Sequence, residues 1–280
     1  MAREALKPFG KTETLYYYAE ACKRLRSFLK GKEIAAKNWI PSPRMPYLIK
    51  RGSREKPLFA EDVAKAVDEN FLRMREKKEH LEEARALLTP LQQNVWNYFP
   101  PRKLNDLFYA TNGEKAGGAI ERVFMDIDRG AGASAEKAQE AARELMAAIK
   151  DERLDGASPP FATWTGASFH VFIFYKKPKP APHYSEIAVL TKKWAGGIGV
   201  AWGHEKKKGA ITLDPSQTPA GKLCRAPFSL HMGNWKSVDG VAVPLGSNEL
   251  EERGLVKRLQ AITPARVLEE MDGYAGKLPL

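Results

Sequence analysis

The segment ERVFMDIDRG, residues 121–130, decides the fold because it alternates apolar residues with two closely spaced aspartates. Successive side chains of a strand point to opposite faces, so Asp126 and Asp128 should share a face, with Cα atoms about 7 Å apart. Carboxylates this close repel each other unless a cation neutralises them, and Mg²⁺ or Mn²⁺ prefers oxygen ligands. The segment therefore predicts a buried strand that ends at a metal-binding cleft. The alternative is a strand that simply runs out into an acidic turn.

The next residues, GAGASA (130–135), permit a different interpretation. They match the loose form G-x-G-x-x-A that binds a dinucleotide pyrophosphate between a strand and a helix. Ser134 is suited to cap the helix expected over 134–150. Two aspartates directly before the loop would repel a pyrophosphate, and no later strand supplies the acid that binds a ribose. A dinucleotide oxidoreductase is thus the weaker reading.

Two further segments carry polar residues at strand positions. In PFATWTGASFHVFIFY (160–175), a turn separates two strands, and Ser168 and His170 share a face of the second. In AITLD (210–214), Asp214 closes a short strand, and Arg225, His231 and Lys236 follow as donors suited to phosphate. Each has a structural alternative, namely a packed ring, a turn former or a surface ion pair. The order of these residues along the chain supports a functional site more strongly than any single residue does.

The overall pattern predicts an α/β (α+β) fold, with mixed or antiparallel sheets flanked by helices. Apolar residues at helical spacing predict a helix over 12–31 and one or two long helices over 58–88. Strands are expected within 121–128, 160–175, 196–202, 210–214 and 241–245, with helix returning over 248–271. We expect one domain over 1–280, with a mostly helical part over 1–100, the core over 101–250 and a helical segment over 251–280.

Charge and composition limit the function classes. The chain of 280 residues has 45 Lys and Arg against 34 Asp and Glu, a net charge of +11. Basic clusters at 50–56, 176–179 and 206–208 have aromatic neighbours, namely Tyr47, Tyr175, Trp194 and Trp202, which suits a phosphate backbone with stacked bases. An ordinary solvated surface is the alternative. No stretch resembles a membrane span or signal peptide, so a cytoplasmic protein without membrane contact is expected.

The motifs FMDID, ASFHVFIF and ITLD followed by CRAPFSLH occur in the order found in a known family. Together they resemble the archaeo-eukaryotic primase superfamily, which includes primases, primase-polymerases and end-joining polymerases. RAPFSLH is similar to a run in archaeal primase catalytic subunits. DRGAGAS and VAVPLGSNEL resemble the polymerase domain of bacterial end-joining ligases. The resemblance implies a primase-polymerase-type catalytic core over about 118–250.

Carried onto this sequence, the resemblance implies that Asp126, Asp128 and Asp214 hold two catalytic ions, Mg²⁺ or Mn²⁺. It implies that the nucleotide phosphates contact a set of basic and hydroxyl residues, namely Ser168, His170, Arg225, Ser229, His231 and Lys236. The zinc-binding cluster of archaeal primase subunits is missing from this sequence, so no structural zinc is expected. The lysine expected after the serine-leucine-histidine run is displaced to Lys236.

The function expected is template-directed nucleotidyl transfer to a nucleic-acid 3′-hydroxyl. Its partners would be a DNA template and primer, nucleoside triphosphates, and replication or end-joining proteins. Gap filling in end joining is the alternative within the same superfamily, and a non-catalytic nucleic-acid-binding subunit is the alternative outside it. The sequence leaves open whether chains are started de novo and which sugar is preferred.

Overall fold

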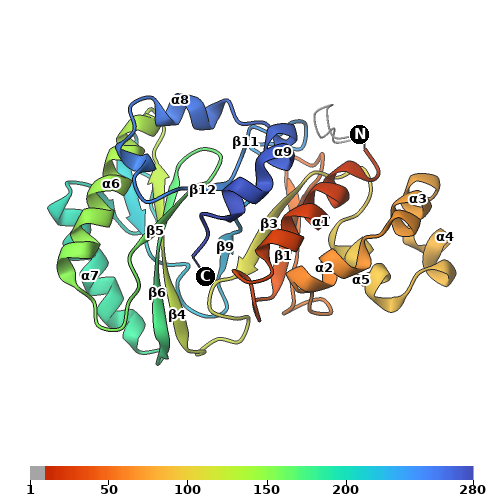
Figure 1. Cartoon of the computed structure of the whole chain (residues 1–280), viewed down its shortest axis with the longest axis horizontal. Coiled ribbons are helices and arrows are strands. Elements are labelled where there is room, and N and C mark those ends of the chain that lie inside the picture. The colour runs from red at the N-terminus through yellow and green to blue at the C-terminus, as the bar shows by residue number, and fades with distance from the viewer. Residues whose placement is uncertain (1–9, 280) are drawn as a thin grey trace.

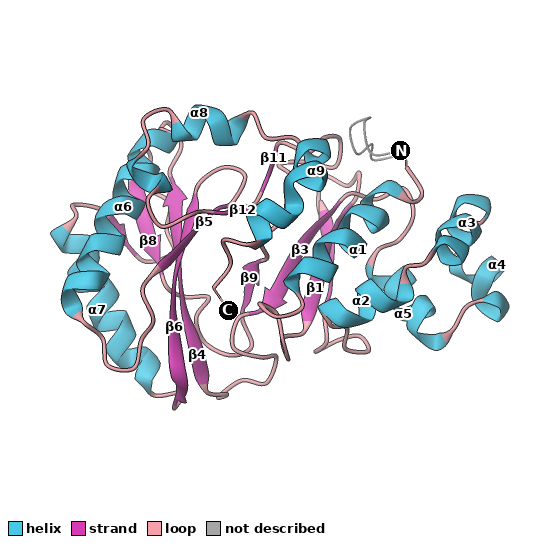
Figure 2. Ribbon diagram, viewed as in Figure 1, coloured by secondary structure: helices cyan, strands magenta, loops and turns pink. Residues whose placement is uncertain are grey.

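A computed structural model describes residues 10–279 of the chain. Within these residues two β-sheets stand side by side, with helices on their outer faces (Figures 1 and 2). The larger sheet has the order β12-β5-β6-β4-β8-β7 and the smaller β2-β1-β3-β9, while β10 and β11 form a separate pair. The prediction of mixed and antiparallel sheets flanked by helices is confirmed.

The strands of the larger sheet are β4 (Ile120–Arg129), β5 (Phe161–Trp164), β6 (Phe169–Lys179), β7 (Ala201–Trp202), β8 (Ile211–Asp214) and β12 (Val243–Pro244). All neighbours in this sheet are antiparallel except β7 and β8. The smaller sheet and the separate pair contain β1 (Ile34–Trp39), β2 (Tyr47–Lys50), β3 (Asn105–Ala110), β9 (Leu223–Arg225), β10 (Leu230–His231) and β11 (Gly240–Val241).

Helices α6 (Ala135–Glu152) and α7 (His183–Gly197) lie on one side of the larger sheet (Figure 1). The Ser134 hydroxyl accepts a hydrogen bond from the Lys137 amide, as expected of a cap. The apolar stripe of α6, which includes Leu145 and Ile149, is buried. Because Asp126 and Asp128 alternate with buried Met125 and Ile127, the aspartates occupy the opposite face. The helices thus leave the acidic face of β4 turned toward the smaller sheet.

Helix α1 (Glu13–Leu25) covers the other sheet and confirms the helical part of the prediction for 12–31. The chain then forms α2 (Ala60–Ala66), α3 (Glu69–Lys77), α4 (Leu81–Ala84) and α5 (Pro90–Tyr98), with a 3₁₀ turn at Arg85–Leu87. The expectation of one or two long helices over 58–88 is wrong. Val67 and Lys78 are extended, and the Asp68 side chain caps a new helix by accepting from the Phe71 amide.

Besides these helices, the first hundred residues contain β1 and β2, whose mixed polar and apolar residues gave no clear period of two. One other expectation about local structure is wrong. Most of the run 196–202 is the end of α7 and a turn, and only Ala201–Trp202 is strand. The C-terminal segment is helical as predicted, with a 3₁₀ turn at Glu249–Glu251, α8 (Leu255–Gln260) and α9 (Pro264–Ala275).

An aromatic cluster joins the two sheets on the same face of the larger sheet as the aspartates, because Phe172 pairs with Phe124. Phe28, which follows α1, packs edge-on against Phe172 of β6 and Tyr109 of β3. The buried Arg122 guanidinium lies over the Phe28 ring and donates to the Phe28 carbonyl at 3.1 Å. This shared core fixes one sheet against the other. No helix among residues 10–279 has the length and apolar character needed to cross a bilayer.

Candidate active site

Three adjacent strands of the larger sheet, β6, β4 and β8, bring ionisable side chains together. We call the three aspartates among them, Asp126, Asp128 and Asp214, the acid row. Asp126 of β4 lies directly opposite Asp214 of β8 and directly opposite His170 of β6. Asp128 lies two residues further along β4, opposite Thr212. Side chains paired across antiparallel strands share a face, so the register places the three aspartates together on the face opposite α6 and α7.

The electrostatics of the row centre on Asp126. Desolvation within the site, with repulsion from Asp128 and Asp214, raises the pKa of Asp126 to about 8, against the attraction of Lys206 and Arg225. Its side chain nevertheless keeps 29% of its surface exposed. An accessible carboxyl that is held protonated by like charges provides a position where a bound cation would restore the negative form.

Lys206 supplies part of the positive charge that this row needs. Its ammonium lies 2.6 Å from Asp128 Oδ1, and although burial opposes it, this contact keeps the pKa of Lys206 above its ordinary value. The loop that carries Lys206 packs closely on the turn after β4, where the Gly209 amide donates to the Ala131 carbonyl at 2.8 Å. The sequence placed Lys206 in a basic cluster but did not indicate its contact with the acids.

The side chains of Asp126, Asp128 and Asp214 do not surround a common position for a metal ion. Within residues 10–279, no three His, Cys, Asp or Glu side chains form a group that could hold a metal ion as they stand. Asp128 is engaged by Lys206, and Asp214 Oδ1 accepts from the Ser216 amide at 2.8 Å. The strand register and the raised pKa of Asp126 fit a cation site, provided that Asp128 exchanges Lys206 for the cation.

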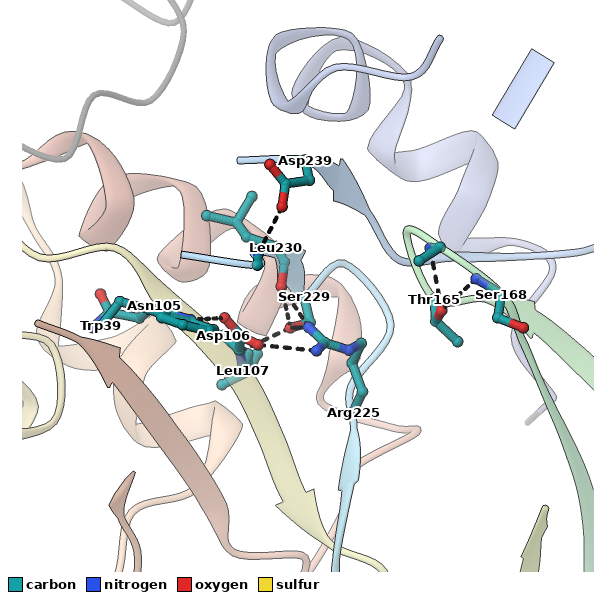
Figure 3. A network of polar contacts seen from close by, with 12 residues as sticks. Trp39, Asn105, Asp106, Leu107, Thr165, Ser168, Arg225, Ser229, Leu230 and Asp239 are labelled. Carbon is teal, nitrogen blue, oxygen red and sulfur yellow. Dashed lines mark hydrogen bonds and ion pairs between the residues drawn. The ribbon is translucent and has the colours of Figure 1, made fainter. Parts of the chain in front are cut away.

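His170 and Ser168 both follow the β5–β6 turn. The His170 ring is buried, with Nε2 3.6 Å from Asp126 Oδ1, and burial together with Arg225 and His231 holds its pKa well below the ordinary value. The imidazole is therefore neutral near pH 7. The buried Ser168 hydroxyl donates to the Ile127 carbonyl and so joins β6 to β4. Its amide donates to Thr165 Oγ1 at 2.9 Å, which closes the turn (Figure 3).

Arg225 of β9 faces the row from the smaller sheet. Figure 3 shows its guanidinium between Asp106 on one side and Ser229 and Leu230 on the other. Nη2 lies 2.9 Å from Asp106 Oδ2, and Nη1 donates to Ser229 Oγ at 3.1 Å and to the Leu230 carbonyl at 2.6 Å. Its charge lowers the pKa of both Asp126 and His170.

The remaining predicted residues lie at different depths. Ser229 is buried, and its hydroxyl accepts from the Leu107 amide at 2.9 Å as well as from Arg225. Burial, with Arg225 nearby, lowers the pKa of His231 to about 4, and its buried Nδ1 has no hydrogen-bond partner among residues 10–279. Lys236 is exposed on the loop between β10 and β11, with its ammonium 5.8 Å from the Trp235 ring centre. The structure thus gathers Arg225, Ser229 and His231 and leaves Lys236 at the surface.

A groove of about 380 Å³ lies on the face of the smaller sheet that also carries Arg225. Its lining combines aromatic, aliphatic and basic groups, namely Lys37, Tyr47, Ile49, Arg51, Phe108, Gln217, Gly221, Lys222 and Leu223. The Lys37 ammonium lies 4.1 Å from the Tyr47 ring centre. In the sequence, Gln217 of the lining follows Asp214 by three positions, and Leu223 precedes Arg225 by two positions on β9.

The loop proposed as a pyrophosphate site is occupied by the chain itself. An added Cβ on Gly130 would lie 1.7 Å from the Lys207 carbonyl oxygen, and the Gly130 amide donates to the Ala210 carbonyl at 2.9 Å. The glycine therefore serves close backbone packing. This observation argues against the dinucleotide reading.

Residues 10–274 match the family described as LigD, primase-polymerase domain. The chain belongs to this family. LigD primase-polymerase domains are part of the archaeo-eukaryotic primase superfamily, so the resemblance seen in the sequence motifs is confirmed. Membership makes the chain a polymerase-type nucleotidyltransferase of the end-joining class.

Among solved structures, the fold is similar to the polymerase domain of ligase D from Mycobacterium tuberculosis in complex with DNA. The TM-score is 0.62 and the sequence identity 16%, over 99% of this chain and 97% of that chain. The likeness at this identity concerns the fold of the LigD primase-polymerase domain. No curated protein matches the sequence.

Proposed function

We propose that the chain extends a DNA 3′-hydroxyl with nucleotides from nucleoside triphosphates, directed by a template strand. The observation that carries this proposal is the register that sets Asp214 opposite Asp126, with Asp128 on the same face. Family membership indicates the class of reaction, and the three aspartates offer a site at which it could take place. A non-catalytic binding module would have no use for three like charges at one position.

Asp126, Asp128 and Asp214 would hold the divalent ions, and Lys206 would give up Asp128 when they bind. Two such ions, Mg²⁺ or Mn²⁺, lower the pKa of the attacking hydroxyl and neutralise the departing pyrophosphate. The protein contributes position and charge. Asp126 sits at the centre of the row and would orient the hydroxyl toward the α-phosphate.

The triphosphate would lie between His170 on the larger sheet and Arg225 and His231 on the smaller one. Both imidazoles are neutral near pH 7, so they would act as hydrogen-bond donors, and Arg225 would supply the charge. Ser168 and Ser229 hold backbone groups and support the site from behind. Lys236, on an exposed loop, is the member of the predicted set least tied to this position.

DNA would follow the groove on the smaller sheet. Tyr47 and Phe108 offer aromatic faces, and Lys37 and Lys222 offer positive charge, which suits bases stacked beside a phosphate backbone. The structurally similar ligase D domain is a DNA complex. Affinity should fall as salt rises because counterions are released on binding.

The test offers labelled nucleotides with Mg²⁺ or Mn²⁺ on two substrates, a gapped duplex with a 5′-phosphate and an unprimed single strand. Incorporation on the gapped duplex, lost in EDTA, is the expected result. Products that appear only on the single strand would favour the primase role. No incorporation on either substrate with either metal would overturn the proposed function.

We also propose that residues 1–280 act as one catalytic unit. The aromatic cluster around Phe28 joins both sheets, and α9 packs on α1 as well as on β11 and β12. Neither sheet therefore carries the proposed site alone. End-joining or replication proteins remain the expected partners, through surfaces outside this site.

A further inference from the structure

A buried carboxylate lies behind Arg225, outside the acid row. Asp106 of β3 is fully buried, yet it is ionisable and sits on the sheet face that carries Arg225. Oδ2 lies 2.9 Å from Arg225 Nη2, and Oδ1 accepts the Trp39 indole N–H at 2.7 Å (Figure 3). Both oxygens are thus used. Lys37, directly opposite Asp106 on β1, adds a second positive charge to its surroundings.

A buried ion pair is not by itself a source of stability, because removing two charges from water offsets most of their attraction. A well-packed apolar pair could join β3 to β9 as well. The ion pair between Asp106 and Arg225 does fix the direction in which the guanidinium points. Asp106 holds one edge of it, and Ser229 and Leu230 hold another.

The tethers leave part of Arg225 available. A guanidinium has five N–H donors, and the contacts among the described residues use three of them. The Nε donor and one Nη2 donor remain for an anion. The Arg225 side chain is 12% exposed, so little of its surface is open, and a small error in its direction would remove the contact.

We propose that Asp106 is a positioning residue that acts through Arg225 to set the affinity for the triphosphate. This assignment deepens the proposed function and rests on it, since it takes the triphosphate to lie against Arg225. Asp106 touches neither the nucleotide nor the ions. It holds the guanidinium in one fixed direction, together with Ser229 and Leu230.

The test measures dATP binding by calorimetry, with Mn²⁺ present, for the wild type, Asp106→Asn, Arg225→Gln and the double variant. Asp106→Asn preserves size and can still accept from Trp39. We expect each single variant to weaken dATP binding by about tenfold, and the double variant to be no weaker than Arg225→Gln. In steady state, the KM for dATP should rise about tenfold while kcat changes by less than about threefold.

Trp39→Phe is the matched control. It removes the other partner of Asp106 but leaves the pair with Arg225, so dATP affinity should stay within about twofold of the wild type. Should Asp106→Asn fail to fold, Ser229→Ala removes a different tether from the same guanidinium, and a loss of about threefold in dATP affinity is expected.

The outcomes separate the two proposals. Unchanged dATP binding in Asp106→Asn, or losses that add in the double variant, would overturn the role of Asp106. Wild-type protein that binds dATP with the expected pattern of losses but never extends a primer would overturn the proposed function and leave Asp106 in its role. Wild-type protein that binds no dATP would overturn both.

Discussion

Asp126 and Asp214 are direct partners across the antiparallel strands β4 and β8. Asp128 shares their face, and desolvation together with these two charges raises the pKa of Asp126 to about 8. Ionisable groups with pKa values shifted this far are typical of functional sites. The pairing therefore marks the centre of the proposed site, and the first test concerns its middle member.

Asp126→Asn should reduce nucleotide addition by at least about a thousandfold, since it removes one of the three carboxylates that would hold the proposed ions. It should not destabilise the fold, because Asn is uncharged, as is the protonated carboxyl that the site favours near pH 7. Primer extension on a gapped duplex, with thermal unfolding of the same sample, measures both effects.

Asp155→Asn is the control for this change. The Asp155 side chain is fully exposed, at 102% of its reference surface, and forms a surface ion pair with Lys179 at 3.7 Å. Extension by this variant should match the wild type. Near-normal extension by Asp126→Asn would remove the acid row from the mechanism.

From the sequence, the residues that make up the acid row could be predicted, but not the strands and side chains that lie next to them. Alternation alone places Asp126 with Asp128 on one face, and Ser168 with His170 on one face, because the period of a strand is two. Alternation cannot tell which strands are neighbours. The pairing of Asp126 with both Asp214 and His170 depends on the sheet order, which the sequence left open.

Asp106 and Lys37 were not predicted to belong to the site. Both lie on strands that mix polar and apolar residues. The one available signal was a charged residue inside NDLFYA (105–110), a run with strand character. A buried ion pair between β3 and β9 depends on long-range packing, which no local pattern encodes.

Lys206→Ala should tighten binding of Mn²⁺ by about threefold to tenfold. The ammonium lies 2.6 Å from Asp128 Oδ1, so it occupies the carboxylate that a cation would use. Removing a positive charge at this distance favours any other cation at the same place. Titration with Mn²⁺, followed by calorimetry, measures the change.

Lys208→Ala provides the comparison, because it removes the same charge from an exposed position on the same loop. Its effect on Mn²⁺ affinity should be smaller than that of Lys206→Ala. If the two variants behave alike, Lys206 acts only through the general field, and direct competition for Asp128 is wrong.

His231 should make stability fall in mild acid. Burial lowers the pKa of His231 to about 4 in the folded protein, against about 6.5 in the unfolded chain. Between these values the unfolded state binds the extra proton, so the free energy of unfolding decreases as pH falls from about 6.5 to 4. The contribution of this group should be about 1 to 3 kcal/mol, measured by urea unfolding across that range.

His231→Gln should flatten this part of the stability profile, whatever its effect on stability at neutral pH. His204→Gln changes an exposed histidine on the loop after β7 and serves as the comparison. A profile for His231→Gln as steep as that of the wild type would show that other groups cause the acid sensitivity.

Gly130→Ala tests the packing that places Lys206 over the acids. An added Cβ would lie 1.7 Å from the Lys207 carbonyl oxygen, a backbone atom that cannot rotate away. The variant should lose about 2 to 4 kcal/mol in urea unfolding, or shift the loop and alter Mn²⁺ affinity as Lys206→Ala does. Gly132→Ala is the control, since its φ of +85° strains an alanine by about 1 to 2 kcal/mol. Among the described residues other than its chain neighbours, no atom lies within 4 Å of the added Cβ. A larger effect at Gly132 than at Gly130 would mean that backbone conformation, rather than contact with Lys207, governs this turn.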